Sequence, residues 1–263
     1  MFFSSLTELT ISQGYKRFFK VVPALSDELR AENFRIRHEV YCRELNYESL
    51  QSNGLETDAY DARSLHCLVQ SAASGQYVGC ARLVLVDLAD PQQSLLPVEV
   101  SCAKTLDRSI VDPLSIDRSC IAEISRLAVV GSYRRRKTDH GPLSIAEEDF
   151  GTEKQPRQPY LALAVYLCLI AMARHYGIST LFILTERRLA ANLSRLGVNI
   201  RQIGGAVEHR GERIPSMLVV DEIIGGMNFL IRAVFEVVSR EVRDGLLAAG
   251  QHAIRAGHRP FSG

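Results

Sequence analysis

The sequence predicts an α/β protein in which a mixed β-sheet lies between helices. Strand-like and helical segments alternate in the order β-α-β-β-β-α-β-α-β, and the three consecutive strands argue against a doubly wound fold. The 263 residues, 46% of them hydrophobic, are enough to bury a sizeable core. The 31 Lys and Arg residues balance 30 Asp and Glu residues, which argues against bulk nucleic-acid binding.

The first half of the chain provides a strand, a helix and a β-hairpin. Aromatic and β-branched residues predict a strand over Tyr15–Leu25, and helical spacing of apolar residues follows over Ser26–Leu45. Strand-like runs at Ser64–Gln70 and Tyr77–Val86 flank SAASGQ, whose glycine and serines suit a hairpin turn. The stretch Asp87–Arg118 contains three of the nine prolines, so we expect looser structure there.

The second half provides three more strands and two helices. Strands are predicted at Ile121–Val130, Ser179–Thr185 and Pro215–Asp221. Leu161–Tyr176 is apolar on nearly every side, which indicates a helix that is buried on most faces. Glu186–Leu196 is a further predicted helix, followed by a glycine that suits a C-cap.

Two segments lie outside this core pattern. The polar stretch at about 137–159 is expected to be a mobile insertion, and Gly225–Gly226 to break the chain after the last strand. The stripe Leu230–Leu246 predicts an amphipathic C-terminal helix that could cover a sheet edge, form a dimer contact or lie on a membrane. Its opposite face is mixed in charge, which favours packing over lipid binding: Arg232, Glu236, Arg240, Glu241 and Arg243. We therefore divide the chain into a domain at 1–221 and a helix with a tail at 222–263.

Cysteine use and hydropathy point to a cytoplasmic protein with at most peripheral membrane association. None of the six cysteines sits in a C-x-x-C motif, so we expect reduced thiols in the core. The N-terminus lacks the pattern of a secretory signal, and the longest apolar run, Tyr160–Ala173, is too short to span a bilayer. The seven histidines show no paired spacing, so no metal site is expected.

Charged residues stand inside two of the predicted strands. Arg82 shares a face by alternation with Val78, Cys80, Val84 and Val86, so it would be buried and would need carboxylate partners. In the next strand, ideal alternation would send Glu123 and Arg126 to opposite faces. If both serve one site, the strand must carry a bulge or splay there. A purely structural ion pair is the other interpretation of these charges.

Two further polar groups lie outside the strands. One combines a helix face with an acidic loop: Arg37, Tyr41, Tyr47, Glu56, Asp58, Tyr60 and Asp61. The other is the basic run at 134–137, which is either an exposed loop or a contact for phosphate or an acidic partner, since guanidinium groups bind phosphate oxygens in forked geometry.

Together these groups resemble a known family. In order and spacing they resemble the motifs of acyl-homoserine-lactone synthases, a group within the GNAT superfamily of N-acyltransferases: Arg37…Tyr41…Tyr47, Glu56-x-Asp58-x-Tyr60-Asp61, Gly79-x-x-Arg82 and Glu123-x-Ser125-Arg126. Segments 64–69, 122–127, 133–136, 203–211 and 216–220 resemble more closely the acyltransferases associated with PEP-CTERM/exosortase systems. The resemblance covers about residues 15–221.

The resemblance implies a GNAT-like acyltransferase fold with an added C-terminal helix. It implies an enzyme that moves a fatty acyl group from an acyl thioester to a small amine, as N-acyl amino acid synthases do. The donor would be an acyl carrier protein with its phosphopantetheine thioester, or acyl-CoA, and no cofactor would be bound. The alternatives are a lactone synthase that uses S-adenosylmethionine and a GNAT domain that binds acyl chains or a partner without turnover.

Two departures from the family pattern bear on the substrates. Lactone synthases usually carry a tryptophan at the position of Tyr47, where it helps to form the S-adenosylmethionine pocket. The glycine-rich pyrophosphate turn of coenzyme A-using GNAT enzymes is not evident, and the basic run at 134–137 stands in its place. A basic surface there would suit the acidic helix and phosphopantetheine of an acyl carrier protein.

The resemblance also implies a role for each site residue. Glu123 would be the general base, with Arg82, Asp58 and Arg126 as the charge network around it. The residues implied in acceptor binding are Arg37, Tyr41, Tyr47, Asp61 and Ser125. Donor binding would involve the backbone near Leu127 and Val129, together with Arg134, Arg135 and Arg136.

Overall fold

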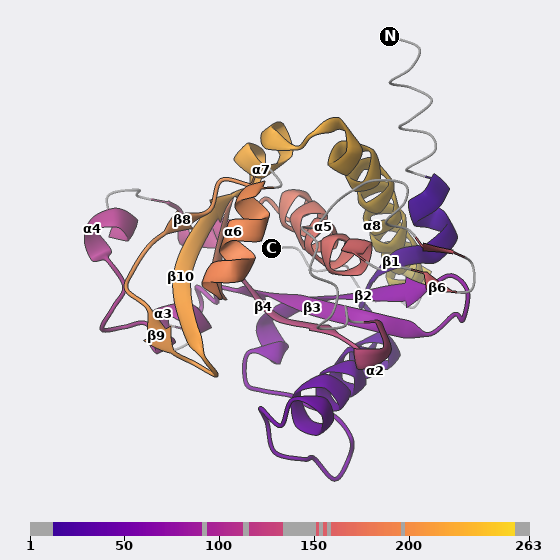
Figure 1. Ribbon diagram of the computed structural model, residues 1–263, viewed down its shortest axis with the longest axis horizontal. Helices are drawn as coiled ribbons and strands as arrows, with labels where there is room; N and C mark the ends of the chain where they lie inside the picture. Colours follow the sequence, from indigo (N-terminus) through magenta and orange to yellow (C-terminus); the bar gives the residue numbers. More distant parts are fainter. Residues whose placement is uncertain are drawn as a thin grey trace.

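An eight-stranded sheet forms the centre of the fold. Its strands are β1 (Phe19–Pro23), β2 (Ser64–Ser71), β3 (Tyr77–Leu85), β4 (Ile121–Val129), β7 (Thr180–Thr185), β8 (Arg201–Gln202), β9 (Val207–Glu208) and β10 (Glu212–Val219). They lie in the order β1-β2-β3-β4-β7-β10-β8, with β9 paired to β10 (Figure 1). All pairs are antiparallel except β4 and β7, which run parallel. The computed structural model describes residues 13–90, 94–112, 116–133, 151–152, 155–156, 159–195 and 198–255.

Helices cover both faces of the sheet. They are α2 (Asp27–Arg37), a π-helix (His38–Glu44), α3 (Pro97–Ser101), α4 (Arg108–Val111), α5 (Pro159–His175), α6 (Arg187–Arg195), α7 (Val220–Gly226) and α8 (Phe229–Arg255). Helices α5 and α8 lie on one face and α2 on the other (Figure 1). The mixed sheet between helices is as predicted, and a short pair of strands, β5 (Gly151–Thr152) and β6 (Gln155–Pro156), lies apart from it.

The sheet parts between β4 and β7. These strands pair only over Ile121–Ile124 and Thr180–Ile183. Beyond Ile124, β4 continues to Val129 paired with β3 alone, while β7 continues against β10. The two halves of the sheet are therefore joined at one end and open at the other.

A β-bulge interrupts β4 where this opening begins. Cys80 pairs with Ala128 and Arg82 with Ser125, so two residues of β4 lie opposite one residue of β3. Arg126, in the bulge, has φ 52°, the left-handed conformation that most residues avoid. The extra residue reverses the alternation, so that Leu127 packs in the core under α5 and Ala128 in the core under α2. The predicted bulge is thus present.

Local corrections to the predicted elements have simple causes. Residues 13–18 are helical, so the first strand is shorter than predicted. The proline-containing stretch forms α3 and α4, and the two-residue strands β8 and β9 are too short to leave a periodic pattern. A register shift in the hairpin turns Val78 into the core under α5, away from Cys80 and Val84.

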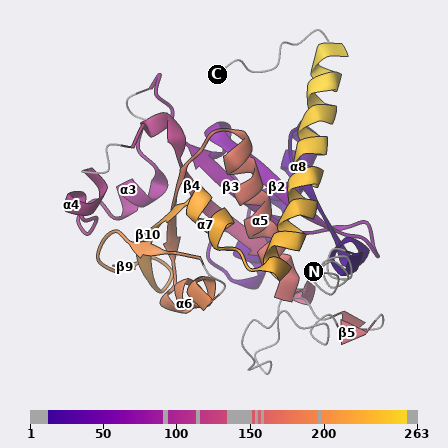
Figure 2. The ribbon, with the colours of Figure 1, turned by 90° about the horizontal axis from the view of Figure 1, so that it is seen from above.

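The C-terminal helix α8 packs against α5 and against the edge strand β1 (Figure 2). Its apolar stripe is buried in the main core: Ile231, Val234, Phe235, Val237, Val238 and Val242. Glu241, predicted on the solvent face, instead accepts hydrogen bonds from the Val21 N–H at 3.0 Å and the Tyr15 hydroxyl at 3.3 Å. The helix therefore covers an open sheet edge, the first of the three predicted possibilities. The proposed boundary after residue 221 falls inside α7 and stays a prediction.

Truncation before Gly225 should abolish stable folding. Burial of one large apolar side chain contributes about 1.5–3 kcal/mol, so loss of the six buried side chains is comparable to the roughly 5–15 kcal/mol by which most proteins are stable. We expect aggregation or loss of the cooperative transition in thermal unfolding followed by circular dichroism. A truncated protein that keeps its melting temperature and loses only liposome binding would contradict this packing role.

The cysteines lie mostly in the core, as predicted. All six cysteines are free, five of them are buried, and Cys120 is half-buried. In the part of the chain that the structure describes, no helix combines the length and the apolar character needed to cross a membrane.

Candidate active site

A cluster of ion pairs lies against β3 and β4, on the face of the sheet that α2 covers. Arg37, the last residue of α2, is fully buried; its Nη1 and Nη2 donate to the Asp61 carboxylate at 2.6 and 3.1 Å and its Nε to Glu56. The carboxylates come from the loop before β2. The helix that carries Arg37 begins at Ser26, whose hydroxyl accepts the Leu29 N–H at 3.3 Å as an N-cap.

Arg82, at the centre of β3, is the second buried cation of the cluster. Its guanidinium donates to both carboxylate oxygens of Asp58, at 2.6 and 2.8 Å, and to Asp61. Its Nε donates to the Ser125 hydroxyl at 3.0 Å. The predicted need for carboxylate partners is confirmed, because the geometry satisfies the charge on all sides. Burial by itself would raise the pKa of Asp61, but Arg37 and Arg82 outweigh it and hold the pKa at about 2.

The bulge in β4 brings Arg126 into the same cluster. Its guanidinium lies 2.9 Å from the Asp58 carboxylate, 3.2 Å from that of Glu56 and 3.4 Å from that of Glu48. The Tyr41 ring lies 5.8 Å from this guanidinium, and the Tyr41 hydroxyl donates to the Leu127 carbonyl in the bulge at 2.7 Å. The backbone of the bulge is therefore fixed from the π-helix as well as from β3.

Two members of the cluster were missed by sequence reasoning. Glu48, in the loop after the π-helix, accepts hydrogen bonds from both Arg126 and Arg210. Arg210, in the β9–β10 turn, also lies 5.7 Å from the Tyr47 ring. The segment 203–211 was noted only for its resemblance, and nothing in its pattern shows that it reaches the other side of the site.

Glu123 is placed differently from the prediction. It is 3% exposed, and its carboxylate accepts the Val98 N–H of α3 at 2.7 Å. Among the described residues no arginine forms an ion pair with it, because the carboxylates of Glu48, Glu56, Asp58 and Asp61 already occupy Arg37, Arg82 and Arg126. Burial raises the pKa of Glu123 to about 8, and the Val98 hydrogen bond and the charges of Arg82 and Arg126 only partly oppose this effect.

His66, on β2, is a buried neighbour of the cluster. Its Nε2 lies 3.4 Å from the Asp61 carbonyl, its ring packs edge-on against Phe34, and its Nδ1 has no hydrogen-bond partner. Burial lowers the pKa of His66 to about 4, and the nearby Arg37 and Arg82 add to this effect. The imidazole is therefore neutral at neutral pH.

His66 should make the protein less stable in mild acid. Between its ordinary pKa of 6.5 and its folded pKa of about 4, only the unfolded state binds the proton, so stability falls as the pH falls. The loss should reach about 3 kcal/mol at pH 4. Urea denaturation at several pH values should show that His66→Gln removes this part of the slope between pH 6.5 and 4. An unchanged slope in the variant would contradict the assignment.

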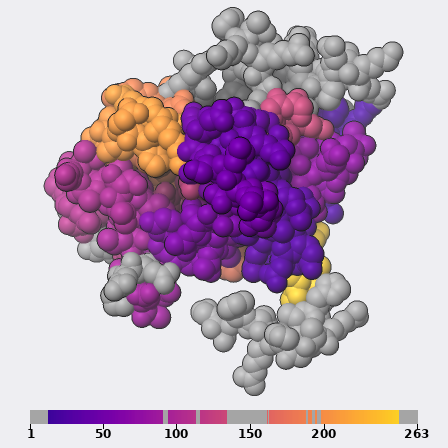
Figure 3. Space-filling view, turned by 90° about the horizontal axis from the view of Figure 1, so that it is seen from below, coloured from indigo at the N-terminus to yellow at the C-terminus, as the bar shows by residue number. Residues whose placement is uncertain are grey.

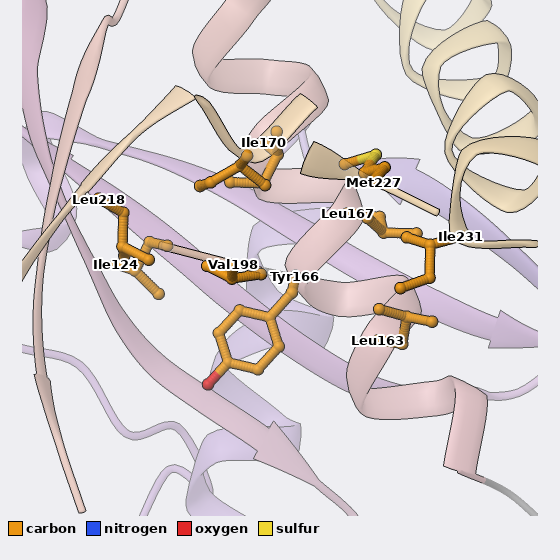
Figure 4. A pocket seen from close by; sticks show the side chains of 10 residues that line it. Ile124, Leu163, Tyr166, Leu167, Ile170, Val198, Leu218, Met227 and Ile231 are labelled. Atoms are coloured by element: carbon orange, nitrogen blue, oxygen red, sulfur yellow. The ribbon is translucent and has the colours of Figure 1, made fainter. Parts of the chain in front are cut away.

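An apolar cavity lies on the opposite face of the sheet, between β4, β10 and the helices α5, α7 and α8 (Figure 4). It is lined by Ile124, Leu163, Tyr166, Leu167, Ile170, Val198, Leu218, Ile223, Met227 and Ile231. Figure 4 shows Ile124 of β4 close to Leu218 of β10, and the Tyr166 hydroxyl directed away from the aliphatic side chains. The cavity thus borders the place where the sheet parts.

The remaining predicted residues fall into two groups. Tyr47 is 40% exposed at the edge of the cluster, and Val129 is buried in the core under α5. Arg134, Arg135 and Arg136, with most of the expected insertion, lie outside the described residues.

One family model matches part of the chain. The model of the acetyltransferase (GNAT) domain family matches residues 36–141, the stretch that contains Arg37, Arg82, Glu123 and Arg126. The predicted GNAT-like fold is confirmed, and the match supports the predicted class of enzyme, an acyltransferase.

Solved structures of similar fold include three with informative descriptions. TofI, solved with an inhibitor and MTA, is 18% identical at a TM-score of 0.55, covering 84% of this chain and 99% of that one. MesI, a CoA-dependent acyl-homoserine lactone synthase, is 24% identical at 0.53, covering 82% and 94%. FeeM, an N-acyl amino acid synthase from uncultured soil microbes, is 14% identical at 0.51, covering 81% and 96%. No curated protein matches the sequence.

Proposed function

We propose that this protein is an N-acyltransferase that moves a fatty acyl group from an acyl thioester to an amine, giving an N-acyl amino acid or a similar amide. One observation carries the proposal. Where β4 parts from β7, an apolar cavity lies on one face of the sheet and a charged cluster on the other. A substrate with an apolar tail and a polar reacting end fits this arrangement.

The acyl chain would occupy the apolar cavity under α5. Its lining is almost wholly aliphatic, so burial of a hydrocarbon tail needs no polar partner. The thioester carbonyl would then lie at the bulge. Backbone N–H groups near Leu127–Val129 are the proposed donors to its oxygen as negative charge develops there.

The reaction needs a base but no covalent intermediate. The amine attacks the thioester carbon, a C–N bond forms, and the C–S bond breaks to release the thiol. Glu123 would accept the proton from the attacking nitrogen, directly or through a water molecule, and that proton can return to the leaving sulfur. An α-ammonium group has a reference pKa of about 7.7–8.0, close to the pKa of about 8 for Glu123.

Asp58 is the other candidate base, but its environment disfavours that role. Burial opposes its charge, yet hydrogen bonds and charge from Arg82 hold the pKa of Asp58 below its ordinary value. A carboxylate stabilised in this way is a poor proton acceptor at neutral pH. Asp58, Arg82 and Arg126 would instead orient the acceptor and hold the bulge in position.

The donor that we propose is an acyl carrier protein. The support is the basic run at 134–137, which stands where a glycine-rich pyrophosphate turn would serve coenzyme A. The resemblance to PEP-CTERM/exosortase-associated acyltransferases supports membership of that group.

Reversing the charges of Arg134, Arg135 and Arg136 should impair use of the carrier protein. The apparent KM for acyl carrier thioester should rise, and the wild-type KM should depend strongly on ionic strength. Short acyl-pantetheine analogues lack the acidic carrier and should be affected less. An equal loss with both donors would indicate a role in folding instead.

Turnover by the purified protein decides between the candidate activities. Acyl carrier thioester or acyl-CoA is incubated with a panel of amino acids or with S-adenosylmethionine, and products are identified by mass spectrometry. An amide-linked acyl amino acid supports the proposal, and an acyl-homoserine lactone overturns it. Tight binding of the carrier without thioester consumption would indicate a non-catalytic domain.

A further inference from the structure

Among the described residues, one carboxylate of the charged cluster, that of Glu48, has no fully buried arginine as a partner. Glu56 and Asp61 are 5% and 9% exposed and are held by Arg37, whereas Asp58 is 23% exposed but accepts from the buried Arg82 with both of its oxygens. Glu48 is 26% exposed and lies in the loop after the π-helix. The Glu48 side chain can turn outwards into water, so breaking its ion pairs does not leave an unpaired carboxylate buried in the protein.

The partners of Glu48 are themselves firmly positioned. Arg126 is held by the bulge and by its contacts with Glu56 and Asp58. Arg210 lies in the turn between β9 and β10, where the His209 N–H donates to the Gly211 carbonyl at 3.0 Å. The two guanidinium groups approach from opposite sides of the site and meet at one carboxylate oxygen.

The β9–β10 turn and the loop after the π-helix lie side by side on this face of the molecule (Figure 3). They are far apart in the sequence and are joined by the Arg210–Glu48 pair and by the stacking of Arg210 on Tyr47. The pair lies at the exposed edge of the charged cluster, since Arg210 is 27% and Tyr47 40% exposed.

Charge balance indicates what could replace Glu48. The cluster contains four arginines, Arg37, Arg82, Arg126 and Arg210, and four carboxylates, Glu48, Glu56, Asp58 and Asp61. When Glu48 turns away, Arg126 and Arg210 are left with an unmatched positive charge, which an incoming carboxylate would neutralise.

We propose that Arg126 and Arg210 bind the carboxylate of the amine acceptor and that Glu48 occupies this position until the acceptor displaces it. The inference rests on the proposed function and narrows the acceptor to amino acids with a free carboxylate. An amine without a carboxylate would leave Glu48 in place and gain nothing from the two arginines.

Substitution of Arg210 and substitution of Glu48 should change the KM for the amino acid in opposite directions. Arg210→Gln removes one charge-assisted contact, so the KM for the amino acid should rise about tenfold or more, with little change in the KM for the thioester. Glu48→Gln removes the competing carboxylate, so the KM for the amino acid should fall. A merely structural pair would give losses in both variants.

The matched control is Arg187→Gln. Arg187 of α6 pairs with Glu212 of β10, close to the turn that carries Arg210, but this pair is exposed and lies outside the cluster. The KM for the amino acid should not change in this variant. Circular dichroism and melting temperature verify that all three variants are folded.

A second measurement does not depend on turnover. Calorimetric titration compares common L-amino acids and S-adenosylmethionine with the corresponding carboxamides, in wild type and in the Arg210→Gln variant. Tighter binding of the acid than of its amide, lost in the variant, supports the inference. Equal binding of acid and amide, or binding of none, overturns it.

The two proposals fail in different ways. If the protein acylates amines but prefers those without a carboxylate, the inference is wrong and the proposed function stands. If the protein acylates no amine yet binds amino acids through Arg210, the proposed function is wrong and the carboxylate site stands.

Discussion

Glu123→Gln should reduce turnover on the order of 100-fold or more while the protein stays folded, because it removes the proposed base. The structure explains why folding should survive. Burial raises the pKa of Glu123 to about 8, so its carboxyl group is mostly neutral at pH 7. Glutamine matches that neutral form in shape and can still accept the Val98 N–H. The melting temperature at pH 7 and the KM for the thioester should therefore change little.

The pH dependence offers an independent test of the same role. In wild type, kcat/KM should rise with pH up to an inflection near pH 8 as Glu123 loses its proton. The acceptor ammonium titrates in the same range, so acceptors with different ammonium pKa values separate the two ionisations. A Glu123→Gln variant that turns over normally would show that Glu123 only anchors α3, and the base would then be sought at Asp58 or in solvent.

Arg82→Ala should destabilise the protein by about 3–5 kcal/mol, the usual effect of removing one partner from a buried ion pair. Arg82 is 1% exposed and is shared by two carboxylates, so its loss leaves Asp58 and Asp61 with excess negative charge. Many proteins are stable by only about 5–15 kcal/mol, so the variant should unfold at much lower urea concentration or fail to accumulate.

Two controls separate charge from packing in this experiment. Arg187→Ala removes an arginine from an exposed pair and should cost less than about 1 kcal/mol. Asp58→Asn, combined with Arg82→Met, removes the stranded charge and restores apolar volume, so it should recover part of the stability. No recovery in the double variant would indicate that packing rather than the buried charge dominates.

The sequence predicted most of the sheet because its strands carry strong local patterns. The hairpin of β2 and β3, the buried helix α5 and the stripe of α8 all follow from hydropathy. The carboxylate partners of Arg82 and the bulge in β4 also followed, because a buried charge and two opposed charges in one strand each demand an exceptional geometry.

The parts that sequence reasoning missed depend on distant segments meeting in space. Glu48 and Arg210 are polar residues in loops, and each looks like an ordinary exposed side chain until the fold places them in contact. In the described part of the chain, Glu123 pairs with the Val98 N–H rather than with an arginine, and this depends on where the first turn of α3 meets β4. Neither arrangement leaves a signal in spacing or alternation.

The parting of β4 from β7 has a consequence for how such a protein diversifies. Under the proposed function, the acyl chain is recognised on one face of the sheet by the residues around Ile170 and Leu218, and the amine on the other face by Arg126 and Arg210. The two sets of side chains have no residue in common and lie on opposite faces of the sheet, so a substitution in one set need not alter the other. Under the proposed function, acyl-chain specificity and amine specificity can therefore change separately in evolution. Enzymes with this one fold could then produce many combinations of acyl chain and amine.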